Sequence, residues 1–323
     1  MEKSALRMLE KFQKAKTNRV LFESLFEECY EYAMPMRQSF YYESPGQRRD
    51  DKIFDETAVV GVQEFASRLQ SGLVPNFARW ADLLAGSEVP DQNQDDINNS
   101  LDQVTDYVFE IIQNSNFGQE VHESFMDLAV GTGILLVEEG DAVNPIRFNA
   151  IPLPTVYLDT GPDDKIDHVY RQRSLKYEEI PIAYQKAELG EKTAKSVETN
   201  PDAKVDVVEI VCRNYSKPNQ DLFDFFVINI PDKELIFQDQ FSGTGSNPFV
   251  CFRWSKASGE IYGRGPLINA LSAIKTTNLT IELVLENAQM AISGIYQMDD
   301  DGIINTDTIN LVPGTIIPKA MGS

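Results

Sequence analysis

The chain has 323 residues, enough to bury a substantial core in one large domain or two modest ones. Its 50 acidic residues against 29 basic ones give a net charge of −21 at pH 7. This excess of acidic residues excludes a protein that binds nucleic acid tightly through clustered Lys and Arg. It remains compatible with a surface that DNA passes without adhering.

The cysteines and the N-terminal residues bound the cellular setting. Cys29, Cys212 and Cys251 are far apart and form no C-x-x-C pair, so we expect reduced thiols in a cytosolic protein, with no disulfide framework and no zinc site. The first residues lack the apolar core of a signal peptide. The longest largely apolar helix candidate, 266–293, carries charged residues, which argues against a membrane span.

Helical periodicity dominates the first third of the chain, and alternation characteristic of strands follows. Helices are expected over 2–16, 19–33, 56–72, 94–114, 117–130 and 177–189, with a polar connector at 190–204. Strands are expected over 134–139, 146–151, 156–158, 166–173, 205–215, 222–230, 235–237 and 249–253. The pattern predicts an α+β protein with a helical N-terminal part and a mixed sheet.

The clearest element is a long helix between Gly265-Pro266 and Gly294, because proline favours helix starts and glycine favours helix ends. One narrow face is polar and carries Lys275, Asn278, Glu282, Glu286 and Gln289. The adjacent broad face is apolar and carries Ile274, Ile281, Val284, Leu285, Ala288 and Ile292. An extended apolar flank needs helical neighbours, and copies of the same chain in a ring could supply them.

Weaker motifs favour structural roles. The segment 131–133 (GTG) precedes a strand and lacks the Lys of a phosphate loop, so it predicts a helix-to-strand turn. The run 299–302 (DDDG) lacks the spacing of a calcium loop and predicts a solvated turn. His122 and His168, the only two histidines, fit structural positions, and paired acids such as Asp163-Asp164 are expected by chance. We therefore predict no catalytic residue, no metal and no cofactor.

Four segments together resemble the head-to-tail connector (portal) family of podovirus-type bacteriophages. They are 55–80, which ends in VPNFARW, 125–139 (FMDLAVGTGILLVEE), 253–279, which opens with RWSKASGEIYGRGP, and 300–314, with DDG and LVPG. The third is the most specific, because aromatic, Gly and Pro residues keep a distinctive order ahead of a long helix. The resemblance covers nearly the whole chain.

The resemblance implies a portal-type fold. Residues 1–262 would form the wing domain, 263–294 the first stem helix and 295–323 the beginning of the clip domain. The family continues with a second stem helix, a channel loop and a crown, and we expect none of these within residues 1–323. The polar stripe of the long helix then has two readings: a solvent-facing side, or the lining of a DNA channel. The apolar flank would pack against neighbouring subunits.

The resemblance also implies a structural role in the virion. The chain would form a ring, usually of twelve copies, at the portal vertex of the capsid, after assembly in the host cytoplasm. Partners would be the major capsid and scaffolding proteins, the terminase large subunit, tail adaptor or nozzle proteins, and double-stranded DNA that passes through without sequence-specific binding. No membrane is involved, and the chain would not be an enzyme.

Two alternatives remain open. Another phage tail or baseplate structural protein would give a ring of different size or no channel. An acidic hydrolase of cell wall or polysaccharide would show glycan degradation that single carboxylate changes abolish.

Overall fold

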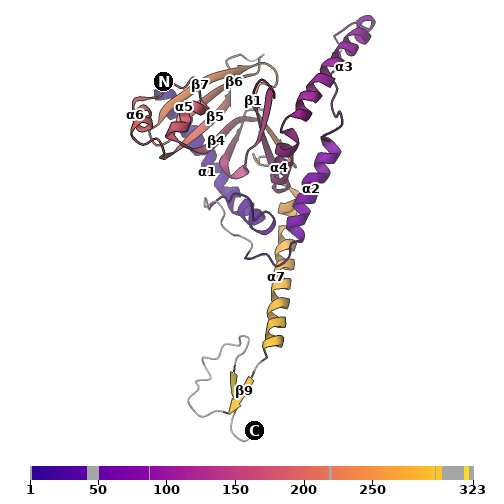
Figure 1. The fold of residues 1–323 in the computed structure, drawn as a ribbon, viewed down its shortest axis with the longest axis vertical. Helices are drawn as coiled ribbons and strands as arrows, with labels where there is room; N and C mark the ends of the chain where they lie inside the picture. The colour runs from indigo at the N-terminus through magenta and orange to yellow at the C-terminus, as the bar shows by residue number, and fades with distance from the viewer. Residues whose placement is uncertain are drawn as a thin grey trace.

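A computed structural model describes residues 2–41, 51–86, 88–217, 220–294, 296–299 and 316–319. The molecule is elongated: a body of two sheets and helices lies in the middle, and two helices extend from it in opposite directions (Figure 1). The longer helices are α1 (Glu2–Ala33), α2 (Thr57–Leu73), α3 (Asp91–Asn114), α4 (Phe117–Val130) and α7 (Pro266–Ser293). The expected α+β class is confirmed.

Two antiparallel sheets build the body. The first has the order β2-β1-β8, from β1 (Thr132–Glu139), β2 (Ile146–Ala150) and β8 (Phe249–Arg253). The second has five strands in sequence order, β3 (Val156–Thr160), β4 (Ile166–Lys176), β5 (Lys204–Arg213), β6 (Leu222–Asn229) and β7 (Glu234–Ser242). Neither body sheet is mixed: every strand pair in both is antiparallel, and short hairpin connections impose this on β1–β2, β3–β4, β5–β6 and β6–β7. A parallel pair joins β9 (Tyr296–Asp299) to β10 (Ile316–Lys319).

Three local predictions are corrected. Helices 2–16 and 19–33 form one helix, because no Gly or Pro interrupts them and the Thr17 hydroxyl bonds back to the carbonyl of Gln13. The helix expected over 177–189 is reduced to a 3₁₀ turn (Tyr177–Glu179) and α5 (Ile180–Ala183), after which the Tyr184 ring enters the core. The expected connector at 190–204 contains α6 (Glu191–Thr199).

Helix α6 depends on a residue far along the chain. The Glu234 carboxylate accepts hydrogen bonds from the backbone amides of Lys192 (3.3 Å) and Thr193 (3.0 Å). These amides lie in the first turn, where no intrahelical acceptor exists. The sequence around α6 does not indicate this cap, because Glu234 lies in β7.

Helix α1 links two hydrophobic clusters. Its first half contributes Ala5, Phe12 and Ala15 to a cluster on the five-stranded sheet. Its second half contributes aromatic and small side chains to the main cluster, which also contains α4, β1 and the start of α7. The position of α7 therefore depends on α1.

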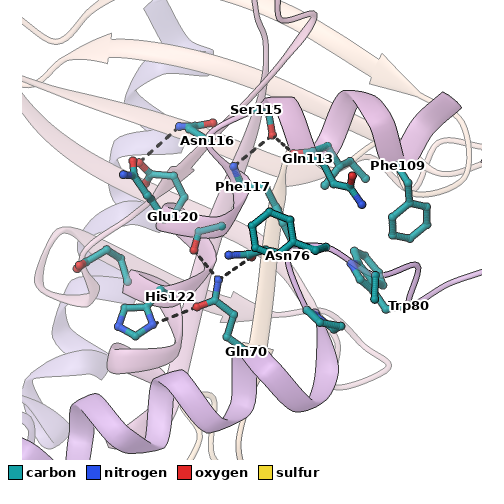
Figure 2. A pocket seen from close by; sticks show the side chains of 17 residues that line it. Gln70, Asn76, Trp80, Phe109, Gln113, Ser115, Asn116, Phe117, Glu120 and His122 are labelled. Carbon is teal, nitrogen blue, oxygen red and sulfur yellow. Dashed lines mark hydrogen bonds between the residues drawn. The ribbon is translucent and has the colours of Figure 1, made fainter. Parts of the chain in front are cut away.

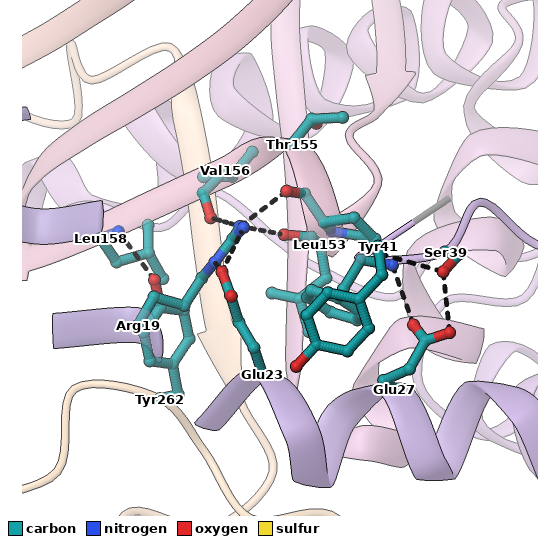
Figure 3. A network of polar contacts seen from close by, with 12 residues as sticks. Arg19, Glu23, Glu27, Ser39, Tyr41, Leu153, Thr155, Val156, Leu158 and Tyr262 are labelled. Carbon is teal, nitrogen blue, oxygen red and sulfur yellow. Dashed lines mark hydrogen bonds and ion pairs between the residues drawn. The ribbon is translucent and has the colours of Figure 1, made fainter. Parts of the chain in front are cut away.

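Arg19 fixes α1 to the sheet (Figure 3). Its side chain is 2% exposed, and Nη1 donates to the carbonyls of Leu153, Pro154 and Val156 at 3.2, 2.7 and 2.9 Å. The guanidinium also pairs with Glu23 at 2.8 Å and lies 3.7 Å from the ring centre of Tyr157. A buried charge is tolerated here because each side of it is paired or stacked.

We predict that Arg19→Met destabilises the protein by about 3–5 kcal/mol, because it leaves Glu23 and three carbonyls without their donor. Chemical denaturation of the purified chain measures the change. The matched control is Arg68→Met, whose exposed side chain pairs, among the described residues, only with Glu64 and whose loss should change stability by about 0.5 kcal/mol or less. Equal effects of the two substitutions would contradict the structural role of Arg19.

Candidate functional site

The start of α7 is joined to the turn between α4 and β1 by closely packed glycines. The Gly265 amide donates to the carbonyl of Val130 at 2.7 Å, and the Trp254 amide donates to that of Gly131 at 2.9 Å. A Cβ on Gly131 would lie 2.1 Å from the Gly263 carbonyl oxygen, and one on Gly265 would lie 2.1 Å from that of Ala129. The segment 131–133 is thus a helix-to-strand turn, as predicted, and the close contact explains Gly263 and Gly265.

The first half of α7 packs against the body. Leu267, Leu271 and Ile274 join the main hydrophobic cluster. Asn278 is 6% exposed: its Oδ1 accepts from the amides of Phe54 (2.7 Å) and Asp55 (3.2 Å), and its Nδ2 donates to the carbonyl of Lys52 (2.8 Å). The side chain therefore fixes the segment that leads into α2.

The second half of α7 leaves the body (Figure 1). Every residue from 283 to 289 is exposed, and Ile292 is 87% exposed. Helical spacing gathers the apolar side chains into two ridges on opposite sides of the helix. The first ridge contains Ile281, Val284, Leu285, Ala288 and Ile292, and the second contains Leu279, Leu283 and Met290.

Two polar stripes separate these ridges. The acidic stripe of α7 is Glu282, Glu286 and Gln289. The hydroxyl-amide stripe, on the other side, is Thr276, Thr280 and Asn287, all exposed. The hydroxyls of Thr276 and Thr280 bond back to the carbonyls of Ser272 and Thr276 at 2.9 and 2.8 Å, so their protons are already used.

The structure places the sequence-based residues in two groups. Lys275 pairs with Glu28 at 2.6 Å and Asn278 is buried, so both are engaged by the body of the chain. Ile274 likewise packs on the core. The remaining candidates lie on the projecting half. The second ridge was missed, although the spacing of Leu279, Leu283 and Met290 is visible in the sequence.

A cavity of about 830 Å³ lies between α2, the end of α3, α4 and the loop that follows α2 (Figure 2). Gln70 holds it together: its Nε2 donates to Asn76 Oδ1 (3.0 Å) and the Gly118 carbonyl (2.7 Å), and its Oε1 lies 3.2 Å from His122 Nδ1. The aromatic wall of the cavity includes Trp80, 5.2 Å from Phe109 between ring centres. The side-chain amides of Gln70, Asn76 and Asn116 and the His122 imidazole are used in local bonds.

Asp127 is a buried acid in α4, the helix that precedes the junction. Its oxygens accept from Tyr30 Oη (2.5 Å) and the Leu153 amide (3.3 Å), and Arg37 Nη1 lies 3.2 Å away. Burial raises the pKa of the Asp127 carboxyl, and the Arg37 charge opposes this shift. Every partner comes from the chain, so Asp127 joins α1, α4 and the segment before β3.

The remaining reactive groups are dispersed. His168 lies in β4, and burial lowers the pKa of its imidazole. Burial raises the pKa of the Cys29 and Cys251 thiols to about 12, which disfavours reactive thiolates. Within the described residues, no three His, Cys, Asp or Glu side chains converge as a metal site. Residues 300–302 lie outside the described residues.

The sequence of this chain matches a known protein family. The model of the bacteriophage head to tail connecting protein family matches residues 5–323. The chain belongs to this family. No protein with a curated description matches the connector. The family is structural, so the connector is a component of the virion that associates with head and tail. None of its described helices is both long and apolar enough to cross a bilayer.

We predict that Gly265→Ala in the connector destabilises the junction by about 2–3 kcal/mol, because the added methyl meets a backbone carbonyl that cannot rotate away. Thermal unfolding combined with limited proteolysis near residue 265 measures it. Gly61→Ala in α2 is the matched control: its methyl meets no atom of the described residues within 4 Å, so helix propensity should stabilise the protein by up to about 1 kcal/mol. Unchanged stability of Gly265→Ala would refute the close packing.

Proposed function

We propose that the chain is the portal subunit of a podovirus-type phage and forms a ring around a DNA channel at one capsid vertex. The observation that carries the proposal is the projecting half of α7, with apolar ridges on two opposite sides. A helix that needs a neighbour on each side fits a closed ring of identical subunits, in which every subunit has two neighbours. The family supports the general role.

The ring would have the partners that its position requires. We propose that it contains twelve copies, contacts the major capsid and scaffolding proteins, and docks the terminase large subunit during packaging. Tail adaptor or nozzle proteins would bind it later, and the genome would leave through it. ATP hydrolysis would belong to the motor, so the subunit itself would perform no covalent chemistry. Assembly would take place in the host cytoplasm.

The division of the chain follows the same proposal. Residues 1–262 would be the wing, 263–294 the first stem helix and 295–323 the beginning of the clip. The junction at Gly265 supports the first boundary, because α7 leaves the body there. The ridge of Ile281, Val284 and Leu285 would meet the Leu279–Leu283 side of the adjacent stem. Burial of both ridges would contribute at about 25 cal/mol per Å² of apolar area removed from water.

One polar stripe of α7 would face the channel and the other the outside of the ring. We propose the acidic stripe of α7 for the channel face, because carboxylates repel phosphate and so prevent adhesive contacts. Our proposal leaves out Lys275 and Asn278 of the predicted set, because both bond to the body of the chain. One observation favours the hydroxyl-amide stripe as the channel face instead. The body lies on the side of α7 that carries Asn278, so the hydroxyl-amide stripe faces away from the body.

We predict ring-shaped particles with a central channel when the purified chain, with any natural continuation beyond residue 323, is imaged by negative-stain electron microscopy. The variant Leu283→Glu and Val284→Glu should reduce ring formation at least tenfold, because each change buries an unpaired charge in a stem contact. Thr276→Glu is the control on a polar stripe. Only monomers from every form of the chain would reject the portal proposal. Rings of other size without a channel would favour a tail or baseplate component.

We predict that rings carrying Glu282→Lys and Glu286→Lys retain linear duplex DNA that wild-type rings release, with binding that weakens as salt rises. Fluorescence anisotropy with labelled DNA measures retention, and packaging into assembled heads should slow. Thr280→Lys and Asn287→Lys place the same number of lysines on the opposite stripe and should have no effect. The reverse result would assign the channel to the hydroxyl-amide stripe.

A further inference from the structure

The first half of α1 is basic in an otherwise acidic chain. Residues 2–19 contain six Lys or Arg and two Glu. Arg7, Lys11 and Lys14 are spaced by four and three residues and therefore follow one side of the helix. Arg7 and Lys14 are exposed and Lys11 is half-buried, and none of the three forms an ion pair with another residue that the structure describes. We call these three residues the basic stripe.

Helix α3 has the opposite character. It contains six acidic residues and no basic one in 24 residues. Five of the acids are exposed on one side, the acidic side of α3: Asp95, Asp96, Asp102, Asp106 and Glu110. Arg79 pairs with Asp102 and, at 2.9 Å, with Asp106. Across the described ranges, Asp95, Asp96 and Glu110 have no cation within ion-pair distance.

The body leaves this side of α3 uncovered. The helix is held by the segment before it: the Ala85 amide donates to Asn98 Oδ1 (2.8 Å), the Leu83 amide donates to Thr105 Oγ1 (3.3 Å), and the Trp80 ring meets Phe109. These contacts use one side of α3. Its far end extends beyond the body (Figure 1).

Exposed apolar side chains accompany both charged surfaces. Leu21 is 82% exposed and continues the line of the basic stripe, seven residues after Lys14. Tyr107 is 64% exposed beside the acidic side of α3, with Val104 and Val108 next to it. Solvated surfaces that only repel other molecules do not need such residues, whereas helix–helix contacts between subunits combine apolar burial with flanking charges.

One molecule cannot bring the two surfaces together. The N-terminal end of α1 and helix α3 lie at opposite edges of the view in Figure 1, with the five-stranded sheet between them. The first half of α1 is fixed on that sheet through Phe12 and Ala15. Two unlike, complementary surfaces on opposite sides of one subunit are the requirement for a head-to-tail contact that repeats around a ring.

We propose that the acidic side of α3 docks on the basic stripe of α1 in a second copy of this chain, as the contact between neighbouring wings. This inference deepens the proposed ring and rests on it. The dimensions agree: Asp95 to Glu110 spans roughly 22 Å, and Arg7 to Leu21 roughly 21 Å, at about 1.5 Å per residue.

Cross-linking of the unmodified chain gives the direct test. A carbodiimide joins a carboxylate to a lysine only at ion-pair distance, so equal amounts of isotopically light and heavy chain are mixed, assembled and cross-linked. Light–heavy peptides that join Lys11 or Lys14 to Asp95, Asp96 or Glu110 support the proposal. Assembled particles that lack these peptides, while other cross-links between subunits are found, overturn it.

Charge exchange tests the direction of the contact. Variant one carries Arg7→Glu, Lys11→Glu and Lys14→Glu, and variant two carries Asp95→Lys, Asp96→Lys and Glu110→Lys. Each alone should need at least a tenfold higher concentration for half-maximal assembly, measured by mass photometry. An equal mixture should recover assembly, because each contact then joins opposite charges in alternating order. Circular dichroism verifies that both variants fold.

The control variant is Glu139→Lys, Glu188→Lys and Glu198→Lys, which makes the same change in net charge as variant two at exposed sites outside α1 and α3. It should assemble as the wild type does. If the wild-type chain forms rings and variants one and two both assemble normally, the proposed contact is wrong and the proposed ring still stands. A wild-type chain that never self-associates would overturn the contact and the portal proposal together. The contact would also be overturned if α1 binds duplex DNA and variant one loses this binding without any change in assembly.

Discussion

The direction of α7 depends on how closely three glycines approach backbone carbonyls. At the junction of α7 with the α4–β1 turn, a single added methyl would lie 2.1 Å from a carbonyl oxygen. Two backbone hydrogen bonds fix the same point. Because a rigid helix amplifies any rotation at its base, a small error at Gly265 would displace Ile292 by many ångströms. The exposed ridges can serve a common purpose only if every copy directs α7 alike.

Basic and acidic residues are concentrated in different regions of this protein. The net charge of −21 is typical of a chain that repels phosphate. The structure adds that one helix half is basic and that it lies far from the most acidic helix. The net charge therefore predicts that the chain repels DNA, whereas the positions of the charged residues bear on how copies of the chain contact one another.

The strongest predictions from sequence concerned elements with local signals. Helix α7 begins and ends where Gly265-Pro266 and Gly294 indicate, and 117–130 and 222–230 match α4 and β6 closely. The failed prediction at 190–204 has a long-range cause, because helix α6 is capped by Glu234. The burial of Asn278 by the segment at 52–55 is likewise invisible in the local sequence. Periodicity placed Asn278 on a polar face, but only the fold shows that backbone groups cover that face. The roles of the remaining residues of α7 stay predictions.

Helix α1 has a further consequence. Its 32 residues supply Phe12 to the cluster on the five-stranded sheet and Phe26, Cys29 and Tyr30 to the cluster beneath α7. Loss of packing in either cluster would free the helix that completes the other, so the two cannot melt independently. Despite its elongated shape, the described body should behave as a single cooperative unit on heating, and a force applied along α7 would be carried directly into the sheet.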